Sequence, residues 1–232
     1  MASTEVKKPS SVLVIAIDGP AGAGKSTVAK ELAKRLNFFY LDTGAMYRAL
    51  TLKALRKKID LEKEDQLVAL AKDTTLDIRG DHSSGIKIYL DGEDVTQEIR
   101  SAEVTNHTFY IARTPGVRAV MVEWQRAIGR TKNIVVEGRD IGTVVFPDAA
   151  KKFYLDADFE ERSHRRIKEL KEQGRPVVEN KLKAELKERD NKDMTRKVGA
   201  LKPAVDAITI DSTHLTIDGV VKKMMELIGP HE

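Results

Sequence analysis

The sequence contains no cysteine and no long apolar run. Without cysteine there are no disulfide bonds, thiol nucleophiles or cysteine-ligated zinc, and this composition suits a reducing compartment. No run approaches the ~18 apolar residues that cross a membrane, and residues 1–10 are polar. The five histidines are scattered without a metal-ligand spacing, which favours surface or structural roles. We therefore expect a cytoplasmic protein that does not enter a membrane.

Aromatic residues are also scarce, at 5% of the chain, so few side chains are offered for base stacking. The net charge is +4, but 40 basic residues are interspersed with 36 acidic ones. A mixed-charge surface with arginines gathered at an anionic site explains this balance better than a nucleic-acid-binding face. At 232 residues the chain can form one α/β core with a small insertion, and no nucleic-acid partner is expected.

A phosphate-binding loop follows the first apolar run, residues 12–17. That run is rich in β-branched side chains and predicts a buried parallel strand, with a helix expected from 26 to 36. The glycines between them let backbone N–H groups point at phosphate oxygens, and the helix N-terminus adds partial positive charge. The pattern Gly, four residues, Gly-Lys-Ser predicts nucleoside triphosphate binding by Gly19, Pro20, Ala21, Gly22, Ala23, Gly24, Lys25, Ser26 and Thr27.

Two side chains of this loop bring chemistry of their own. Lys25 is a mobile cation that can reach the β- and γ-phosphates, so we predict it to be catalytic. The hydroxyl of Ser26 is placed to coordinate Mg²⁺, which is the expected metal cofactor. No metal-binding cluster is then needed elsewhere.

Buried strands alternate with amphipathic helices along the rest of the chain. This alternation is typical of an α/β fold in which a doubly wound parallel sheet carries helices on both faces. Further strands are expected at residues 38–41, 133–136, 152–156 and 207–211, and further helices at 45–57, 63–71 and 117–130.

Between residues 75 and 99 the hydrophobic period changes from 3.6 to two. Turn-forming residues at 80–85 separate two alternating segments, which predicts a small antiparallel sheet inserted into the core. The pattern alone is equally compatible with a decorative hairpin and with a mobile flap over a second substrate.

A very polar helical region covers residues 158–197. Residues 173–176 read Gln-Gly-Arg-Pro and predict a break, so that two helices would form a hinged lid. A phosphoryl transition state needs donors around its equatorial oxygens, and we predict Arg165 and Arg166 as the catalytic arginines that contact it. The alternative is a solvated helical hairpin in which these arginines pair with nearby glutamates.

Five blocks of sequence together resemble the bacterial-type cytidylate kinases, which are nucleoside monophosphate (NMP) kinases of the P-loop class. The resemblance spans about residues 12 to 228 and implies ATP-dependent phosphorylation of CMP and dCMP with Mg²⁺, in pyrimidine metabolism. It also favours a functional β insert. The five blocks are residues 19–27, 41–48, 137–143, 146–149 and 188–190; the implied parts are a core at 11–73, 104–158 and 192–232, an NMP-binding insert at 74–103 and a helical lid at 159–191.

The same resemblance implies which residues hold the acceptor nucleotide. Three residues besides Asp140 match positions that bind the base, and two arginines match positions near the monophosphate. Two residues at and just beyond the C-terminal end of the lid match the sugar-binding pair. In that order they are Thr43, Arg118 and Arg196; Arg48 and Arg139; and Arg189 and Asp193. A small hydroxyl residue usual in the family is replaced by Phe109, with Thr108 beside it.

The role of Asp140 follows from the chemistry of cytosine. Its N4 amine is a hydrogen-bond donor, and the Asp140 carboxylate supplies the acceptor. Uracil presents a carbonyl at that place and would leave the carboxylate unpaired, which is costly in a buried site. We therefore expect CMP to be preferred over UMP.

Two other functions share parts of this sequence pattern. A kinase of AMP or shikimate shares the phosphate loop but not the Glu-Gly-Arg-Asp block with a long β insert. A GTPase-type switch needs Asn-Lys-x-Asp, whereas residues 191–194 read Asn-Lys-Asp-Met within a predicted helix. We expect a monomeric kinase with no side-chain nucleophile, in which closure of the lid and the insert excludes water.

Overall fold

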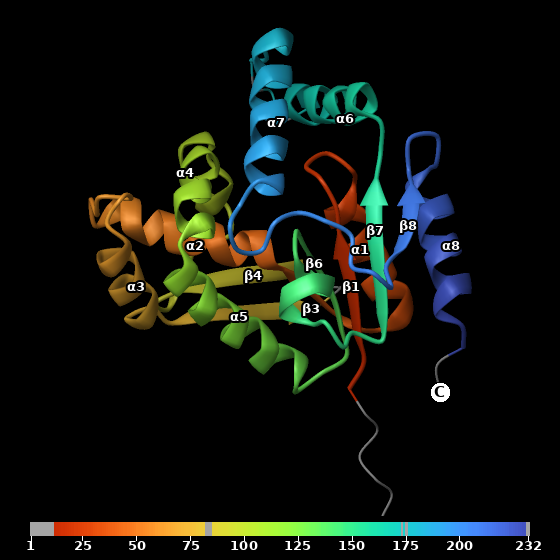
Figure 1. The fold of residues 1–232 in the computed structure, drawn as a ribbon, viewed down its shortest axis with the longest axis horizontal. Coiled ribbons are helices and arrows are strands. Elements are labelled where there is room, and N and C mark those ends of the chain that lie inside the picture. Colours follow the sequence, from red (N-terminus) through yellow and green to blue (C-terminus); the bar gives the residue numbers. More distant parts are fainter. Residues whose placement is uncertain (1–11, 82–84, 173, 175, 231–232) are drawn as a thin grey trace, which may run out of the picture.

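The computed structural model describes residues 12–81, 85–172, 174 and 176–230. Three expectations fall wholly or partly outside these ranges: the polar residues 1–10, the turn at 82–84, and Gln173 and Arg175 of the predicted helix break. Within the described ranges a five-stranded parallel sheet runs through the molecule, so the predicted α/β fold is confirmed (Figure 1). In spatial order its strands are β2 (Phe39–Asp42), β6 (Ile134–Gly138), β1 (Val14–Asp18), β7 (Lys151–Asp156) and β8 (Ile208–Asp211).

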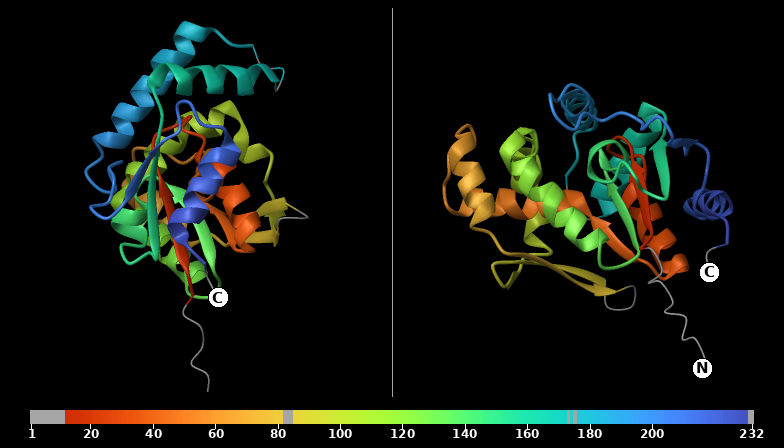
Figure 2. Two further views of the ribbon diagram at one scale, coloured as in Figure 1. Left: turned by 90° about the vertical axis from the view of Figure 1, so that its right-hand side faces the viewer. Right: turned by 60° about the horizontal axis from the view of Figure 1, so that its bottom comes forward.

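Helices cover both faces of this sheet (Figures 1 and 2). On β1, Ile15 and Ile17 belong to one apolar cluster, while Ala16 between them belongs to another on the opposite face. Both faces of the strand are therefore buried, which explains its uninterrupted apolar run. The first face packs on α1 (Lys25–Leu36) and α8 (Ile217–Ile228), and the second on α2 (Thr43–Arg56) and α5 (Pro115–Gly129).

Two helices show what the sequence pattern missed. Helix α2 begins at Thr43, two residues before the predicted start, because the Asp42 side chain accepts a hydrogen bond from the Ala45 N–H at 2.9 Å and caps it. Helix α8 was not predicted at all, although Val220, Val221 and Met224 form a buried stripe along it. Its spacing of apolar residues was the available signal.

The predicted insert is an antiparallel sheet of β3 (Leu76–Asp81), β4 (Gly85–Leu90) and β5 (Glu93–Asp94). It continues into the short turn η1 (Glu98–Arg100) and helix α4 (Ala102–Arg113). Ile88, Leu90 and Ile99 are buried in one cluster with the Ala49 and Leu52 side chains of α2. The insert and α2 therefore share an apolar core.

The two predicted lid helices, α6 (Phe159–Glu172) and α7 (Glu179–Met194), stand beyond the carboxyl ends of the strands (Figure 1). Two residues of α7, Leu186 and Asp190, are buried, and most of the rest is exposed. The remaining elements are α3 (Glu64–Lys72), which packs on α5, and η2 (Ile141–Val145), a wide turn that follows β6. None of the helices in the described ranges combines the length and apolar character needed to cross a membrane.

Candidate active site

The phosphate loop joins β1 to α1 at the carboxyl edge of the sheet. A side chain at Gly19 would collide with the Leu155 carbonyl of β7, and one at Gly22, where φ is 80°, would lie 2.9 Å from the Arg162 carbonyl oxygen. Glycine is needed at both places because the backbone is in close contact with its neighbours. All nine predicted ATP-binding residues lie in this loop and the first turn of α1, where Ser26 and Thr27 are exposed.

Lys25 lies back across its own loop. Its Nζ donates a hydrogen bond to the Pro20 carbonyl at 2.6 Å, and the side chain is buried. Burial lowers the pKa of Lys25 to about 7, and the nearby positive charge of Arg139 acts in the same direction, although Glu137 opposes it. A phosphate bound beside this buried amine would favour its charged form and oppose the lowering of its pKa.

Glu137 is a site residue to which the sequence reasoning gave no role. It is the penultimate residue of β6, is 5% exposed, and accepts a hydrogen bond from the Tyr40 hydroxyl at 2.5 Å. Burial raises its pKa, the charge of Asp42 adds to this, and Lys25 and a hydrogen bond with Ser26 oppose it. The available signal was a charged residue at the carboxyl end of a buried strand. Together, the Ser26 hydroxyl and the Glu137 carboxylate provide the oxygen donors that suit Mg²⁺.

Asp140 and Arg118 form a buried ion pair at the centre of the predicted base pocket. The guanidinium of Arg118 also donates to the Tyr47 hydroxyl at 3.3 Å. A side chain at Gly199 would collide with both members of the pair, so the backbone after α7 lies directly against them. Burial raises the pKa of Asp140, while Arg118 and then Arg196 oppose this shift.

The other predicted base contacts lie around this pair. The Thr43 hydroxyl donates to the Glu137 carbonyl at 2.7 Å. Arg196 pairs with Asp193 at 3.6 Å, and its Nε and Nη2 atoms are buried without a hydrogen-bond partner. Unsatisfied donors of a buried guanidinium are costly, and a ligand with acceptor atoms would satisfy them.

Several arginines gather where the acceptor phosphate is predicted. The Arg48 Nη2 atom donates to Asp42 at 2.9 Å, and the Arg139 Nε atom donates to Asp193 at 2.7 Å. Arg189 is exposed to solvent but surrounded on several sides, and this partial desolvation, followed by the charge of Arg139, lowers its pKa to about 10. Cations that disfavour one another's charge in this way form a site for an anion.

The two predicted catalytic arginines of the lid lie in different surroundings. Arg165 donates to the Ser212 carbonyl at 2.6 Å and pairs with Glu161 at 2.7 Å. Arg166 pairs with Glu169 at 2.6 Å, so the glutamate pairs of the alternative interpretation are present. The positive charge of Arg166 still contributes to lowering the pKa of Arg189. A contact with transferred phosphate stays a prediction for both.

Arg162 connects the lid to the phosphate loop, a link that the sequence pattern did not indicate. Its Nη1 atom donates to the Ala21 carbonyl at 3.0 Å and to Asp190 of α7 at 2.5 Å. All three groups are buried. Both lid helices are thus anchored to the loop through one guanidinium.

The family position that departs from the usual pattern lies on α4. The Thr108 hydroxyl is used within the helix, where it donates to the Val104 carbonyl at 2.7 Å. The ring of Phe109 lies between Arg113, 5.4 Å from the ring centre, and Lys192 of α7, 5.1 Å away. This position therefore offers an apolar ring that contacts the lid side.

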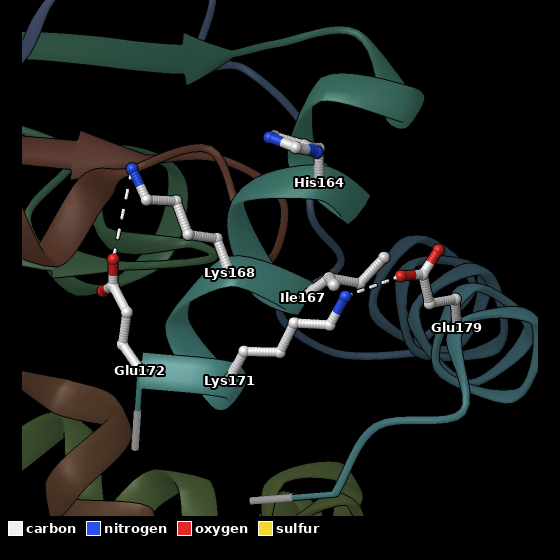
Figure 3. Close-up of a pocket in the computed structure, with 6 residues that line it drawn as sticks. All are labelled: His164, Ile167, Lys168, Lys171, Glu172 and Glu179. Atoms are coloured by element: carbon white, nitrogen blue, oxygen red, sulfur yellow. Dashed lines mark hydrogen bonds and ion pairs between the residues drawn. The ribbon is translucent and has the colours of Figure 1, made fainter. Parts of the chain in front are cut away.

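A cavity of about 480 Å³ lies between α6 and α7, and Figure 3 shows its lining residues. Lys171 and Glu179, 2.9 Å apart, connect the two helices at its edge. None of the predicted site residues lines it. In the described part of the chain, no three His, Cys, Asp or Glu side chains gather as a metal-ligand set.

The comparisons with known proteins point to one family. Residues 15–229 match the family model for cytidylate kinase. The chain is 49% identical over 214 residues to a cytidylate kinase of Caldanaerobacter subterraneus subsp. tengcongensis, covering 92% of this chain and 93% of the relative. It is 51% identical over 211 residues to a cytidylate kinase of Desulforamulus reducens, covering 91% and 94%.

Among solved structures, the shikimate kinase from Bacteroides thetaiotaomicron has a TM-score of 0.47 and 14% identity, with 93% of this chain and 98% of that chain covered. A likeness this distant does not bear on function. The family match and the two relatives, in contrast, each span nearly the whole chain. This protein therefore belongs to the cytidylate kinase family, and it is a phosphotransferase.

Proposed function

We propose that this protein transfers the γ-phosphoryl group of ATP to CMP and dCMP, with Mg²⁺, by in-line attack of an acceptor phosphate oxygen. The main support is the position of the buried Asp140–Arg118 pair. Asp140 follows β6, the strand that is hydrogen-bonded to β1, and β1 leads into the phosphate loop. A base reader and a triphosphate cradle on adjacent strands bring the two nucleotides together at one edge of the sheet.

On the donor side, the backbone N–H groups of residues 19–27 would surround the phosphates of ATP. Lys25 would exchange its hydrogen bond with the Pro20 carbonyl for the β- and γ-phosphates. Ser26 would hold Mg²⁺, with Glu137 beside it as a second oxygen donor. When bound, Mg²⁺ neutralises charge on the β- and γ-phosphates.

On the acceptor side, Arg48, Arg139 and Arg189 would bind the monophosphate. A planar guanidinium can hold two phosphate oxygens at once, and three of them fix the orientation of the attacking oxygen. The ribose would lie by Arg189 and Asp193. No side chain has to act as a nucleophile, so catalysis consists of positioning and charge stabilisation.

Recognition of cytosine would rest on the Asp140 carboxylate, which accepts from the N4 amine, and on donors from Arg118, Thr43 and Arg196. The buried donors of Arg196 gain partners when the base binds. UMP would leave Asp140 unpaired toward the base and should be a poor acceptor.

Closure of the lid and the insert would exclude water and so prevent ATP hydrolysis. We also propose that the enzyme acts as a monomer. We further propose a cytoplasmic location, where ATP and CMP are available. Size measurement by light scattering and fractionation of cells test these two statements.

The experiment that tests the reaction is a coupled assay of ADP formation with ATP and Mg²⁺. CMP, dCMP, UMP and AMP are compared as acceptors at equal concentration. Fast turnover with CMP and dCMP and little with UMP is expected. Faster turnover with UMP or AMP would overturn the assignment of the base pocket, and no stimulation by any acceptor would overturn the reaction.

A further inference from the structure

Asp18 is a buried carboxylate to which the scheme above gives no task. It is the last residue of β1, directly before the phosphate loop, and is 3% exposed. Its Oδ1 atom accepts a hydrogen bond from the Ile141 N–H and its Oδ2 atom one from the Gly142 N–H, both at 2.8 Å. Both oxygens thus bind backbone that lies more than 120 residues further along the chain.

The two N–H groups belong to the beginning of η2. The first N–H groups of a helical turn have no partner within the turn, so a buried turn needs acceptors from elsewhere. Asp140 immediately precedes this turn, and its carbonyl accepts from the Val144 N–H at 2.9 Å. Asp18 therefore holds the segment that begins with the base-reading carboxylate.

Holding a turn with a buried carboxylate costs free energy, because the charged group loses its contact with water. Burial raises the pKa of Asp18 to about 6, and the two backbone hydrogen bonds oppose this shift only in part. The negative charge of Asp140 also raises the pKa of Asp18. The gain is geometric, because one planar carboxylate that accepts two hydrogen bonds fixes both the position and the direction of the backbone that donates them.

Resting on the cytosine contact proposed above, we propose that Asp18 is a positioning residue for base recognition. By binding the N–H groups of Ile141 and Gly142, it sets the Asp140 carboxylate at a fixed distance from the phosphate loop. The loop starts at the next residue, Gly19, whose backbone is packed against Leu155. One side chain thus fixes the base reader relative to the triphosphate cradle.

The test uses Asp18→Asn in the full-length protein. The asparagine has the same shape but only one acceptor oxygen, so one N–H is left unpaired and faces an amide donor. We expect the KM for CMP to rise about tenfold and the CMP-to-UMP ratio of kcat/KM to fall by about the same factor. The KM for ATP should change less than about twofold, since the loop itself is intact.

A control variant that lowers stability at a place remote from the site distinguishes a purely structural role of Asp18 from a role in base recognition. Ile210→Val shortens a fully buried side chain of β8 that has no part in the site. If Asp18 only stabilises the fold, both variants lower the melting temperature and neither changes the CMP-to-UMP ratio of kcat/KM. That result would overturn the proposal. Asp18→Ser, whose hydroxyl can accept one N–H, is measured if the asparagine variant does not fold.

A double-mutant cycle shows whether Asp18 acts through Asp140. In an Asp140→Ala background, Asp18→Asn should have no further effect on the CMP-to-UMP ratio. An undiminished effect there would contradict the proposal. If Asp140→Ala alone leaves the ratio unchanged, the proposed cytosine contact itself has failed; if Asp140→Ala lowers the ratio and Asp18→Asn does not, the role of Asp18 alone has failed.

Discussion

The proposed donor half and the proposed acceptor half of the site are built by different means. The donor half is a continuous stretch of backbone, held in shape by glycines packed against β7 and α6. The acceptor half consists of charged side chains from α2, α5, α7 and the segment after β6, held by ion pairs such as Arg118 with Asp140 and Arg139 with Asp193. Backbone shape is encoded locally, whereas an ion pair exists only when distant segments meet.

The two halves should therefore fail differently when single residues are changed. Damage to the donor half should lower the rate with every acceptor. Damage to the acceptor half should change the choice of acceptor. The predictions below begin with the largest expected effect.

Lys25→Ala should lower kcat by about 10³-fold or more, because the transferred phosphoryl group loses its nearest cation. The loss should be equal with CMP and dCMP, as measured by the coupled ADP assay. Lys34→Ala, which removes an exposed lysine of the same helix, is the control and should leave kcat unchanged. A kcat within tenfold of the wild-type value for Lys25→Ala would contradict the role given to this lysine.

Asp140→Asn should lower the CMP-to-UMP ratio of kcat/KM by about 100-fold, because the amide can donate to the uracil carbonyl. Steady-state kinetics with both acceptors measure this ratio. Asp77→Asn in β3, whose carboxylate pairs with the exposed Arg79, should not change it. An unchanged ratio for Asp140→Asn would show that the base is read elsewhere.

Gly22→Ala should raise the KM for ATP by about tenfold, because the new methyl group meets the Arg162 carbonyl in a backbone with positive φ. Gly92→Ala is the matched control: its φ is 90°, and nothing lies within 4 Å of the new methyl group. The control should show conformational strain, seen as a lower melting temperature, without a change in the KM for ATP. Equal effects on KM would mean that strain alone accounts for the loss.

Between pH 7 and pH 8, we expect the donor half to be the source of the pH dependence. The pKa of Lys25 is lowered to about 7, so this lysine is charged below pH 7 and neutral above it in the free enzyme. ATP binding above pH 7 must then restore the proton, and the KM for ATP should rise about threefold to tenfold from pH 7 to pH 8. A KM for ATP that stays constant across this range, measured at saturating CMP, would be inconsistent with the lowered pKa.

The insert and the lid show a similar contrast in how they are attached. The insert shares a buried apolar core with α2, and Lys53 of α2 pairs with Asp91 at 2.7 Å. The lid is connected to the phosphate loop through Arg162 and Asp190. We expect the insert to move only together with α2, whereas the lid can rotate about a few polar contacts.

Much of the fold could be predicted from the sequence. The strands of the parallel sheet were each placed within two residues, because apolar runs bounded by glycine, proline or charge are local signals. The antiparallel insert was found from its change of period. Helix α8 was missed although its stripe was present, and the cap at Asp42 shows why helix starts shift by a residue or two.

Within the site, the sequence motif indicated the phosphate loop, and the resemblance supplied the acceptor residues, which stay predictions. Glu137 was quoted within a motif without a role, and Asp18 and the Arg162 link were not anticipated. Their importance depends on burial and on partners far along the chain, such as Ile141 for Asp18. A sequence pattern contains the residue type but not its exposure.

The sequence by itself determined that this chain forms a phosphate loop on a parallel sheet, since short-range backbone preferences and hydrophobic periodicity suffice for that. Only the tertiary structure decided which of its many charged side chains are buried together. Asp18, Glu137 and Asp140 end or follow neighbouring strands, and the sheet order brings them beside Lys25 and Arg118. The physical reason is that electrostatic interactions become strong and selective only where packing has excluded water.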